Sequence, residues 1–368
     1  MSSGIPDHRL NNIDALRLIL AVLVLFSHCY PLATGSEQDE PLFVFSRGQL
    51  TLGGLAVDCF FILSGYLIVQ SWERSRSAGS YMMKRVKRIY PGYLVAVAVC
   101  VWVVVPIASP DGFAVFSWHT VLDNSWRFVT LRGFQTPDAF VTNPTPLAVN
   151  GSLWSIPFEF WCYIGVLLLG VCGLLRRRRT VLALLLVSIG VHFIVEWQEL
   201  TPGGKFLGVI FGYPKTWARL LPCYLVGTVL YLYRERLQLD WRWAVVAVIG
   251  FVVAARVPHG MVFAVPTFVA YLLIFASYQS TVRWHTASKW GDFSYGIYLY
   301  AYPIQQLMMY FIGHPIAPLE LFALSLPPTV LAGVLSWCLV ERWFLRPAAK
   351  KTVSVSHADL HRRPDAHK

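Results

Sequence analysis

An arginine and a histidine stand eleven residues apart in an otherwise apolar stretch, NNIDALRLILAVLVLFSHCYPL, residues 11 to 32. In a helix, eleven residues rotate by about 1100°, only about 20° past three turns, so Arg17 and His28 share one face. They are separated by roughly 16 Å along the axis, so the arginine lies near one membrane surface and the histidine in the opposite half. Ionisable side chains at such depth normally face a protein interior or a watery cavity, which makes both candidates for a functional site.

Two carboxylates are expected at a depth comparable with that of His28. Asp58 lies about a turn and a half into the apolar stretch GGLAVDCFFILSGYLIVQ, and Glu159 lies about two turns into NGSLWSIPFEFWCYIG. A carboxylate beside an imidazole orients the ring and stabilises its cationic form, as the third member of a catalytic triad does. We therefore expect His28 to accept a proton, with Glu159 or Asp58 as its partner. For Glu159 the alternative is a buried polar contact that only holds helices together.

Three further arginines are candidates for binding anions. In KRVKRIYP, Arg85 and Arg88 are three residues apart and face the same way on a helix, so they can present two guanidinium groups to one polyphosphate. The alternative is an ordinary basic anchor at the cytoplasmic surface. Arg219, near the outer end of a later apolar stretch, is expected either to meet an anionic acceptor or to extend to the membrane surface.

Composition indicates that membrane helices position these residues. Of 368 residues, 56% are hydrophobic and 14% are charged, with a mean hydropathy of +0.52, whereas soluble domains carry about 25% charge. We therefore predict an all-α, polytopic membrane protein of about ten transmembrane helices. The apolar runs are near 14–34, 53–71, 91–108, 153–172, 180–196, 217–233, 241–256, 262–278, 293–312 and 321–341. Residues 1–345 are expected to form one membrane domain, and 346–368 a polar, disordered cytoplasmic tail.

The distribution of positive charge predicts the orientation. Of the 31 Lys and Arg residues, 23 fall in segments that lie inside when both termini are cytoplasmic, and six fall outside. The net charge of +11 therefore requires no nucleic-acid partner. All seven cysteines lie in predicted spans without metal-ligand spacing, so we read them as packing residues and expect no metal.

Six motifs in order carry a resemblance to a known family. Arg17 with His28, then VDCFFILSGYLI, KRVKRIYP, SLWSIPFEFWCY, SYGIYLYAYP and LVERWFLRP resemble acyltransferase family 3, whose members are bacterial integral-membrane enzymes. The resemblance covers residues 13 to about 347. Many members have a histidine after YLY, where this chain has Ala301, so no role is assigned to that position.

The resemblance implies a reaction, a location and several roles. It implies transfer of an acyl group, commonly acetyl from acetyl-CoA, to a hydroxyl of a surface glycan or another exported molecule. It implies a multi-pass protein of the bacterial cytoplasmic (inner) membrane. It also implies that Arg17 and His28 are essential and that Arg85 and Arg88 serve the acyl donor.

These expectations combine into one mechanistic hypothesis. Phosphates of cytosolic acyl-CoA meet Arg85, Arg88 and Arg17, and the pantetheine arm enters the bundle toward His28. His28 then accepts the proton of the attacking hydroxyl, or forms a covalent acyl-histidine. The acceptor, a glycan or a lipid-linked saccharide, approaches from outside, where the long segment 109–152 carries aromatic and polar residues suited to sugar binding.

Two other functions fit part of the pattern. A glycan or lipid transporter would use His28, Asp58 and Glu159 as a proton relay, although the chain shows no internal repeat of the kind on which many transporters are built. A non-enzymatic scaffold for glycan assembly would tolerate loss of His28.

Overall fold

The computed structural model describes residues 11–133, 138–201, 208, 211–279 and 291–345. All regular elements in these ranges are helical, which confirms the predicted all-α class. The bounds of most long helices lie within a few residues of the predicted apolar runs, but the helix expected at 91–108 already begins at Ala78, so the basic motif KRVKRIYP is helical too. The predicted polar tail, 346–368, lies outside the described residues.

The first half of the chain contains α1 (Ile13–Thr34), α2 (Pro41–Phe45), α3 (Leu52–Glu73), α4 (Ala78–Val99), η1 (Cys100–Val104), α5 (Val105–Ala108), η2 (Gly112–Val115), α6 (Trp118–Val129), η3 (Gly151–Ser155) and α7 (Ile156–Val171). The second half contains η4 (Leu174–Arg176), α8 (Arg178–Trp197), α10 (Pro214–Leu232), η5 (Arg234–Arg236), α11 (Trp241–Arg256), α12 (Gly260–Ala264), η6 (Val265–Val269), α13 (Ala270–Tyr278), α14 (Ser294–Ile312), α15 (Pro318–Ser336), η8 (Trp337–Glu341) and α16 (Arg342–Leu345).

Within the described chain, seven helical segments are long and apolar enough to cross a membrane. The three other predicted spans also form helices, namely α10, α11 and α14. Of these, α11 has only 16 residues, α10 carries Lys215 and Arg219, and α14 carries Gln305 and Gln306, which are buried in the bundle. The predicted number of ten spans therefore stays a prediction.

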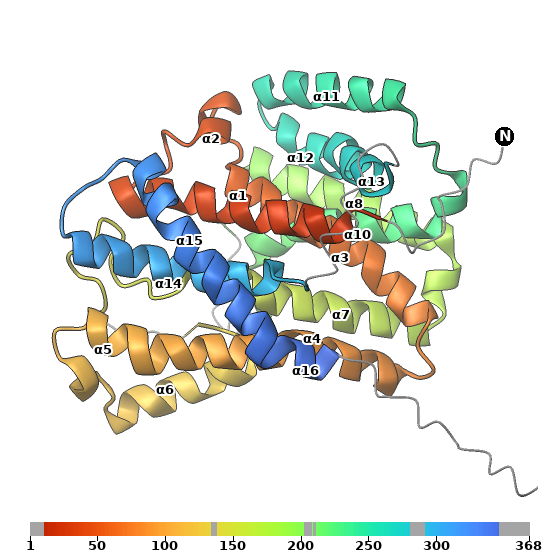
Figure 1. Ribbon diagram of the computed structural model, residues 1–368. Helices are drawn as coiled ribbons and strands as arrows, with labels where there is room; N and C mark the ends of the chain where they lie inside the picture. Colours follow the sequence, from red (N-terminus) through yellow and green to blue (C-terminus); the bar gives the residue numbers. More distant parts are fainter. Residues whose placement is uncertain (1–10, 134–137, 202–207, 209–210, 280–290, 346–368) are drawn as a thin grey trace, which may run out of the picture.

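Helix α3 forms the centre of the bundle. The most apolar stretch of α3 is 67% buried, whereas the corresponding stretches of α8 and of α15 to α16 are only 22% buried. Helix α3 packs against α1, α7 and α10, and α15 crosses obliquely over the bundle from the end of α14 to α4 (Figure 1). Side chains that project from α3 are therefore well placed to line interior cavities.

The helices define two ends of the bundle. We call the end where α1, α4 and α14 begin, and where α3 and α7 finish, the basic end, because Arg17, Arg85 and Arg88 lie there. The opposite end is called the far end. Helices α1 and α14 run in the same direction and contact each other (Figure 1), so they carry their residues in matching order from one end to the other.

Part of the predicted outer segment 109–152 folds back along the bundle. It contains α6, and Tyr90 of α4 donates a hydrogen bond of 3.0 Å to the carbonyl of Val129 at the end of this helix. Tyr93 donates to the carbonyl of Arg132 at 2.7 Å. Both tyrosines lie near the middle of the continuous helix from α4 to α5. The end of α6 therefore lies beside the middle of this helix, and not beyond the end of the helix bundle.

Two glycines allow α3 and α10 to touch at their backbones. A Cβ added to Gly65 would collide with the carbonyl oxygen of Tyr224, and one added to Gly227 would collide with that of Ile62. Small residues at such contacts let membrane helices approach closely. The contact fixes α10, and therefore Arg219, relative to α3.

The Gly227→Ala variant should destabilise the protein because its new methyl group meets immovable backbone. We expect the free energy of unfolding to fall by about 2 kcal/mol, as overpacking does elsewhere, measured as a lower melting temperature in detergent. Gly190→Ala in α8 is the matched control, because an added Cβ there meets nothing within 4 Å. Equal melting temperatures for the two variants would contradict this packing.

Candidate active site

Three charged side chains from three helices meet at the basic end. Arg17 Nη1 of α1 lies 2.7 Å from Asp292 Oδ2, and Arg88 Nη2 of α4 lies 2.5 Å from the same oxygen. Ser294 Oγ donates to the other oxygen of Asp292 at 2.5 Å. The three charged side chains are only 15 to 22% exposed, so this ion triad ties α1 and α4 to the start of α14.

The charge state of Asp292 follows from its neighbours. Burial alone would raise the pKa of its carboxyl group, but the adjacent Arg17 and Arg88 guanidinium groups outweigh burial and hold the pKa well below its usual range. Asp292 therefore stays anionic and neutralises one of the two arginines. Sequence reasoning missed this residue, although it stands two positions before the SYGIYLYAYP motif.

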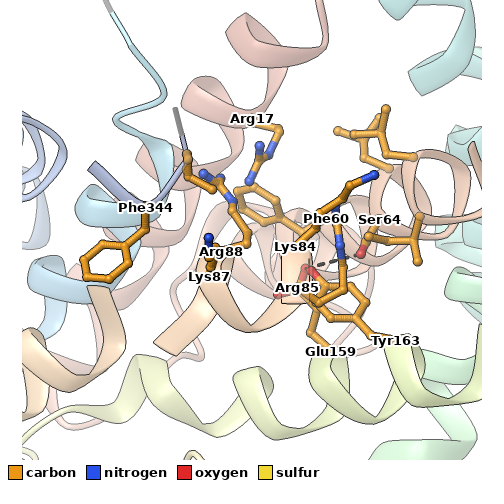
Figure 2. Close-up of a pocket in the computed structure, with 14 residues that line it drawn as sticks. Arg17, Phe60, Ser64, Lys84, Arg85, Lys87, Arg88, Glu159, Tyr163 and Phe344 are labelled. Atoms are coloured by element: carbon orange, nitrogen blue, oxygen red, sulfur yellow. Dashed lines mark hydrogen bonds between the residues drawn. The ribbon is translucent and has the colours of Figure 1, made fainter. Parts of the chain in front are cut away.

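A cavity of about 440 Å³ opens beside the triad. We call it the basic cavity, because five cationic side chains line it together with Phe60, Ser64, Glu159, Tyr163 and Phe344 (Figure 2). The five are Arg17, Lys84, Arg85, Lys87 and Arg88. Such an excess of positive charge suits a ligand with several negative charges. The structure thus brings together the three arginines that the sequence selected for the donor.

Arg85 is held at the wall of the basic cavity with part of its donor capacity unused. Its Nη2 donates to Ser71 Oγ at 3.1 Å, and its guanidinium carbon lies 5.7 Å from the centre of the Tyr163 ring. Its Nε is buried without a hydrogen-bond partner in the described chain. A buried, unsatisfied guanidinium nitrogen is unusual and is consistent with a site that receives a ligand oxygen.

Glu159 belongs to the basic cavity rather than to His28. It accepts hydrogen bonds from Ser64 Oγ at 3.2 Å and from Tyr163 Oη at 2.5 Å. Along η3 and α7 it lies eight residues beyond Gly151, or roughly 14 Å nearer the basic end. The predicted common depth of Glu159 and His28 is therefore not seen, because Gly151 is the residue that lies at the His28 level, against the Tyr302 ring.

His28 lies against an aromatic ring in the far half of the bundle. Its ring centre is 5.3 Å from that of Tyr302, in an edge-to-face arrangement. Its Nδ1 is buried and has no hydrogen-bond partner among the described residues. The position of His28 follows from the parallel course of α1 and α14. Arg17 contacts Asp292 near the start of both helices. His28 is eleven residues after Arg17 and Tyr302 is ten residues after Asp292, so these two side chains also contact each other.

A narrow cavity of about 50 Å³ leads from the basic cavity toward His28. The two cavities share Arg17, Phe60 and Glu159 in their walls. Of the α14 residues that line it, Tyr298 is nearest to Tyr302 and marks its tip, and the Tyr298 hydroxyl lies 2.6 Å from that of Ser155. Because Tyr298 is one turn before Tyr302, the narrow cavity ends roughly 6 Å short of the level of His28.

Asp58 is paired with Arg219 and does not contact His28. Arg219 Nε donates to the two oxygens of Asp58 at 3.1 and 3.4 Å. The reason is that Asp58 lies on another face of α3 than the one that contacts α1. Gly53 faces Ser27 of α1. Five residues later the helix has rotated by about 500°, about 140° beyond a full turn, so Asp58 faces α10. The predicted depth of Asp58 is compatible with that of His28, but the carboxylate points the other way.

Comparison with known proteins decides the family. The acyltransferase domain model of acyltransferase family 3 matches residues 10–340. The chain belongs to acyltransferase family 3. It is therefore an acyltransferase and, with its several apolar helices, a multi-pass membrane protein.

Relatives in this family carry related names. The chain is 30% identical over 350 residues to an "O-acetyl transferase" of Shigella phage Sf6, covering 94% of this chain and 98% of the relative. It is 26% identical over 375 residues to "Nodulation protein 10" of Rhizobium leguminosarum bv. viciae, covering 96% of each chain. "Acyltransferase MdmB" of Streptomyces mycarofaciens matches 45% of this chain at 26% identity. No solved structure matches significantly.

Removing the shared anion of the ion triad should destabilise the basic end. In Asp292→Asn, Arg17 and Arg88 keep their charges without a counter-ion, so we expect the free energy of unfolding to fall by roughly 3 kcal/mol. The control is Glu235→Gln, because Glu235 is 70% exposed and 4.0 Å from Arg178; its expected cost is below about 1 kcal/mol. Thermal unfolding in detergent compares them, and a similar loss in both would refute the structural importance of the triad.

Proposed function

We propose that this protein is a membrane O-acyltransferase that transfers an acyl group, acetyl in the first instance, from cytosolic acyl-CoA to a hydroxyl of a surface or exported glycan. We place it in the bacterial inner membrane, with the basic end at the cytosol. The observation that carries the proposal is the basic cavity, where five cationic side chains gather in a chain that belongs to an acyltransferase family. The name of the phage O-acetyl transferase supports the choice of acetyl.

The charges of the basic cavity suit the phosphates of coenzyme A. Among the described residues, Lys84, Arg85 and Lys87 form no ion pair, while Arg17 and Arg88 share the charge of Asp292. Phosphate groups bound there would leave the uncharged pantetheine arm free to extend along the narrow cavity, past Phe60 and Glu159. Binding the donor by its nucleotide in this way fixes the thioester in the bundle without burying the charged phosphates in lipid.

His28 is proposed as the proton acceptor. The hydroxyl oxygen of the acceptor attacks the thioester carbonyl, its proton passes to the imidazole, and the carbon–sulfur bond breaks to release CoA as a thiolate that recovers the proton. An acyl-histidine formed first and then attacked by the hydroxyl gives the same products. The unpartnered Nδ1 and the position beyond the tip of the narrow cavity support this role.

A proton-conducting transporter receives less support. His28, Asp58 and Glu159 would have to exchange protons, yet Asp58 is paired with Arg219 and Glu159 with Ser64 and Tyr163. In the part of the chain that the structure describes, His28 contacts neither carboxylate. The described structure therefore shows no contacts through which these three side chains could pass a proton to one another.

Loss of His28 should abolish acylation. Cells that express His28→Ala at the wild-type level are expected to lose the acyl mass increment from their surface glycans, because the variant lacks the proposed proton acceptor. Mass spectrometry of the extracted glycans measures this mass increment. The control is His314→Ala, an exposed histidine at the far end, which should keep the increment. An acylated glycan from the His28→Ala cells, or none from wild-type cells, would overturn the proposal.

Loss of Arg85 should weaken donor use. In Arg85→Ala we expect the KM for acetyl-CoA to rise by about tenfold, since a charge-assisted hydrogen bond to phosphate contributes about 1.5 kcal/mol or more. Release of CoA by purified protein in lipid nanodiscs gives the KM. Arg242→Ala, which removes an exposed arginine outside the basic cavity, is the control. If Arg85→Ala and Arg242→Ala have the same KM for acetyl-CoA, the basic cavity does not bind the donor.

A further inference from the structure

A cavity at the far end differs chemically from the basic cavity. It has a volume of about 750 Å³ and lies among the first turns of α3 and α10, the last turns of α8, and α12 with η6. Its lining includes Asp58 and Arg219 together with Trp154, His192, Glu196 and Lys215. We call it the far cavity.

The charges of the far cavity balance one another. Three cationic side chains, Arg47, Lys215 and Arg219, and three carboxylates, Asp58, Glu196 and Glu199, line it. Four of these six side chains form two ion pairs. Arg219 Nε lies 3.1 Å from Asp58 Oδ1, and Lys215 Nζ lies 3.8 Å from Glu196 Oε1. A polyanion gains little from such a lining, whereas a neutral ligand with many hydroxyl groups finds both donors and acceptors.

Two features favour a saccharide among neutral ligands. Trp154 is 41% exposed in a cavity wall, so its indole offers an apolar face of the size of a sugar ring. Arg219 Nη2 is buried and has no hydrogen-bond partner in the described chain, so a ligand hydroxyl would satisfy it. Carboxylates, histidines and an aromatic plane together match the alternation of polar edges and apolar faces in a sugar.

The far cavity adjoins the narrow cavity through two thin walls. On α3, Asp58 lines the far cavity and its neighbour Val57 lines the narrow cavity. On η3, Trp154 lines the far cavity and its neighbour Ser155 lines the narrow cavity. Consecutive residues therefore face opposite sides of the same partition, which separates the space suited to the donor arm from the space suited to a sugar.

We propose that the far cavity binds the saccharide portion of the acceptor, with Trp154 packed against a neutral sugar ring and the Asp58–Arg219 pair bonded to its hydroxyls. This inference rests on the proposed function, because it requires a glycan acceptor. It revises the sequence-based expectation for Arg219, since an arginine already neutralised by Asp58 is suited to hydroxyl groups rather than to an anion. It also moves the expected sugar contacts from the predicted outer segment 109–152 to Trp154 at the end of η3 and to α10.

The test compares three variants of the full-length protein in nanodiscs, with acetyl-CoA as donor and surface glycan extracted from the host as acceptor. For Trp154→Ala we expect the KM for glycan to rise about tenfold, with kcat and the KM for acetyl-CoA within twofold of wild type. Trp154→Phe keeps an aromatic face and should recover most of the affinity. Trp102→Ala, which removes a 61% exposed indole outside the far cavity, should leave all three constants unchanged.

Ionic strength gives a second measurement that does not depend on any variant. Added salt should raise the KM for acetyl-CoA, because phosphate binding is screened, and should leave the KM for glycan unchanged. An unchanged glycan KM in Trp154→Ala, or a glycan KM that rises with salt as the acetyl-CoA KM does, overturns the neutral-saccharide site while leaving the acyltransferase proposal intact. Absence of acylated glycan with wild-type protein overturns both.

Discussion

The arrangement depends on one carboxylate that holds two guanidinium groups. Asp292 joins Arg17 of α1 to Arg88 of α4 two residues before α14 begins, and neither arginine could lie in a membrane interior without such a partner. Because α1 and α14 then run side by side from this point, the pairing at the basic end also sets which residues meet in the far half. The contact between His28 and Tyr302 is thus a consequence of an ion triad about three turns away.

The second constraint is the division of polar chemistry between the two ends. Five cationic side chains line the basic cavity beside Glu159, with Asp292 adjacent to two of them, whereas the far cavity is balanced in charge and partly aromatic. An enzyme that joins a polyanionic donor to an uncharged polyhydroxy acceptor needs such unlike sites, because like sites would let either substrate occupy both. Helix α3 contributes to both, because Asp58 lines the far cavity whereas Phe60 and Ser64 line the basic cavity.

The sequence predicted the helices and the shared face of Arg17 and His28, because hydrophobic runs and an eleven-residue spacing are local properties. It also predicted correctly that Arg85 and Arg88 line one space. It did not predict the partners of the carboxylates. Asp58 has a suitable depth but faces α10, since Gly53 is the residue that contacts α1. Helix α3 is apolar on all sides, so its sequence pattern does not indicate which face packs against which neighbouring helix. Asp292 stands between helices, where periodicity gives no signal.

His28 occupies a place where a carboxylate partner was expected and an aromatic ring is found. In the described chain its Nδ1 lacks any partner, and a cation formed there would lack compensation from the protein. The compensation can come from the reaction, because attack on a thioester creates negative charge on the carbonyl oxygen and then on the departing sulfur. The imidazole would then take a proton only while that charge is present beside it. In the proposed mechanism, proton transfer would therefore depend on the arrival of both substrates, and this dependence would limit hydrolysis of the donor.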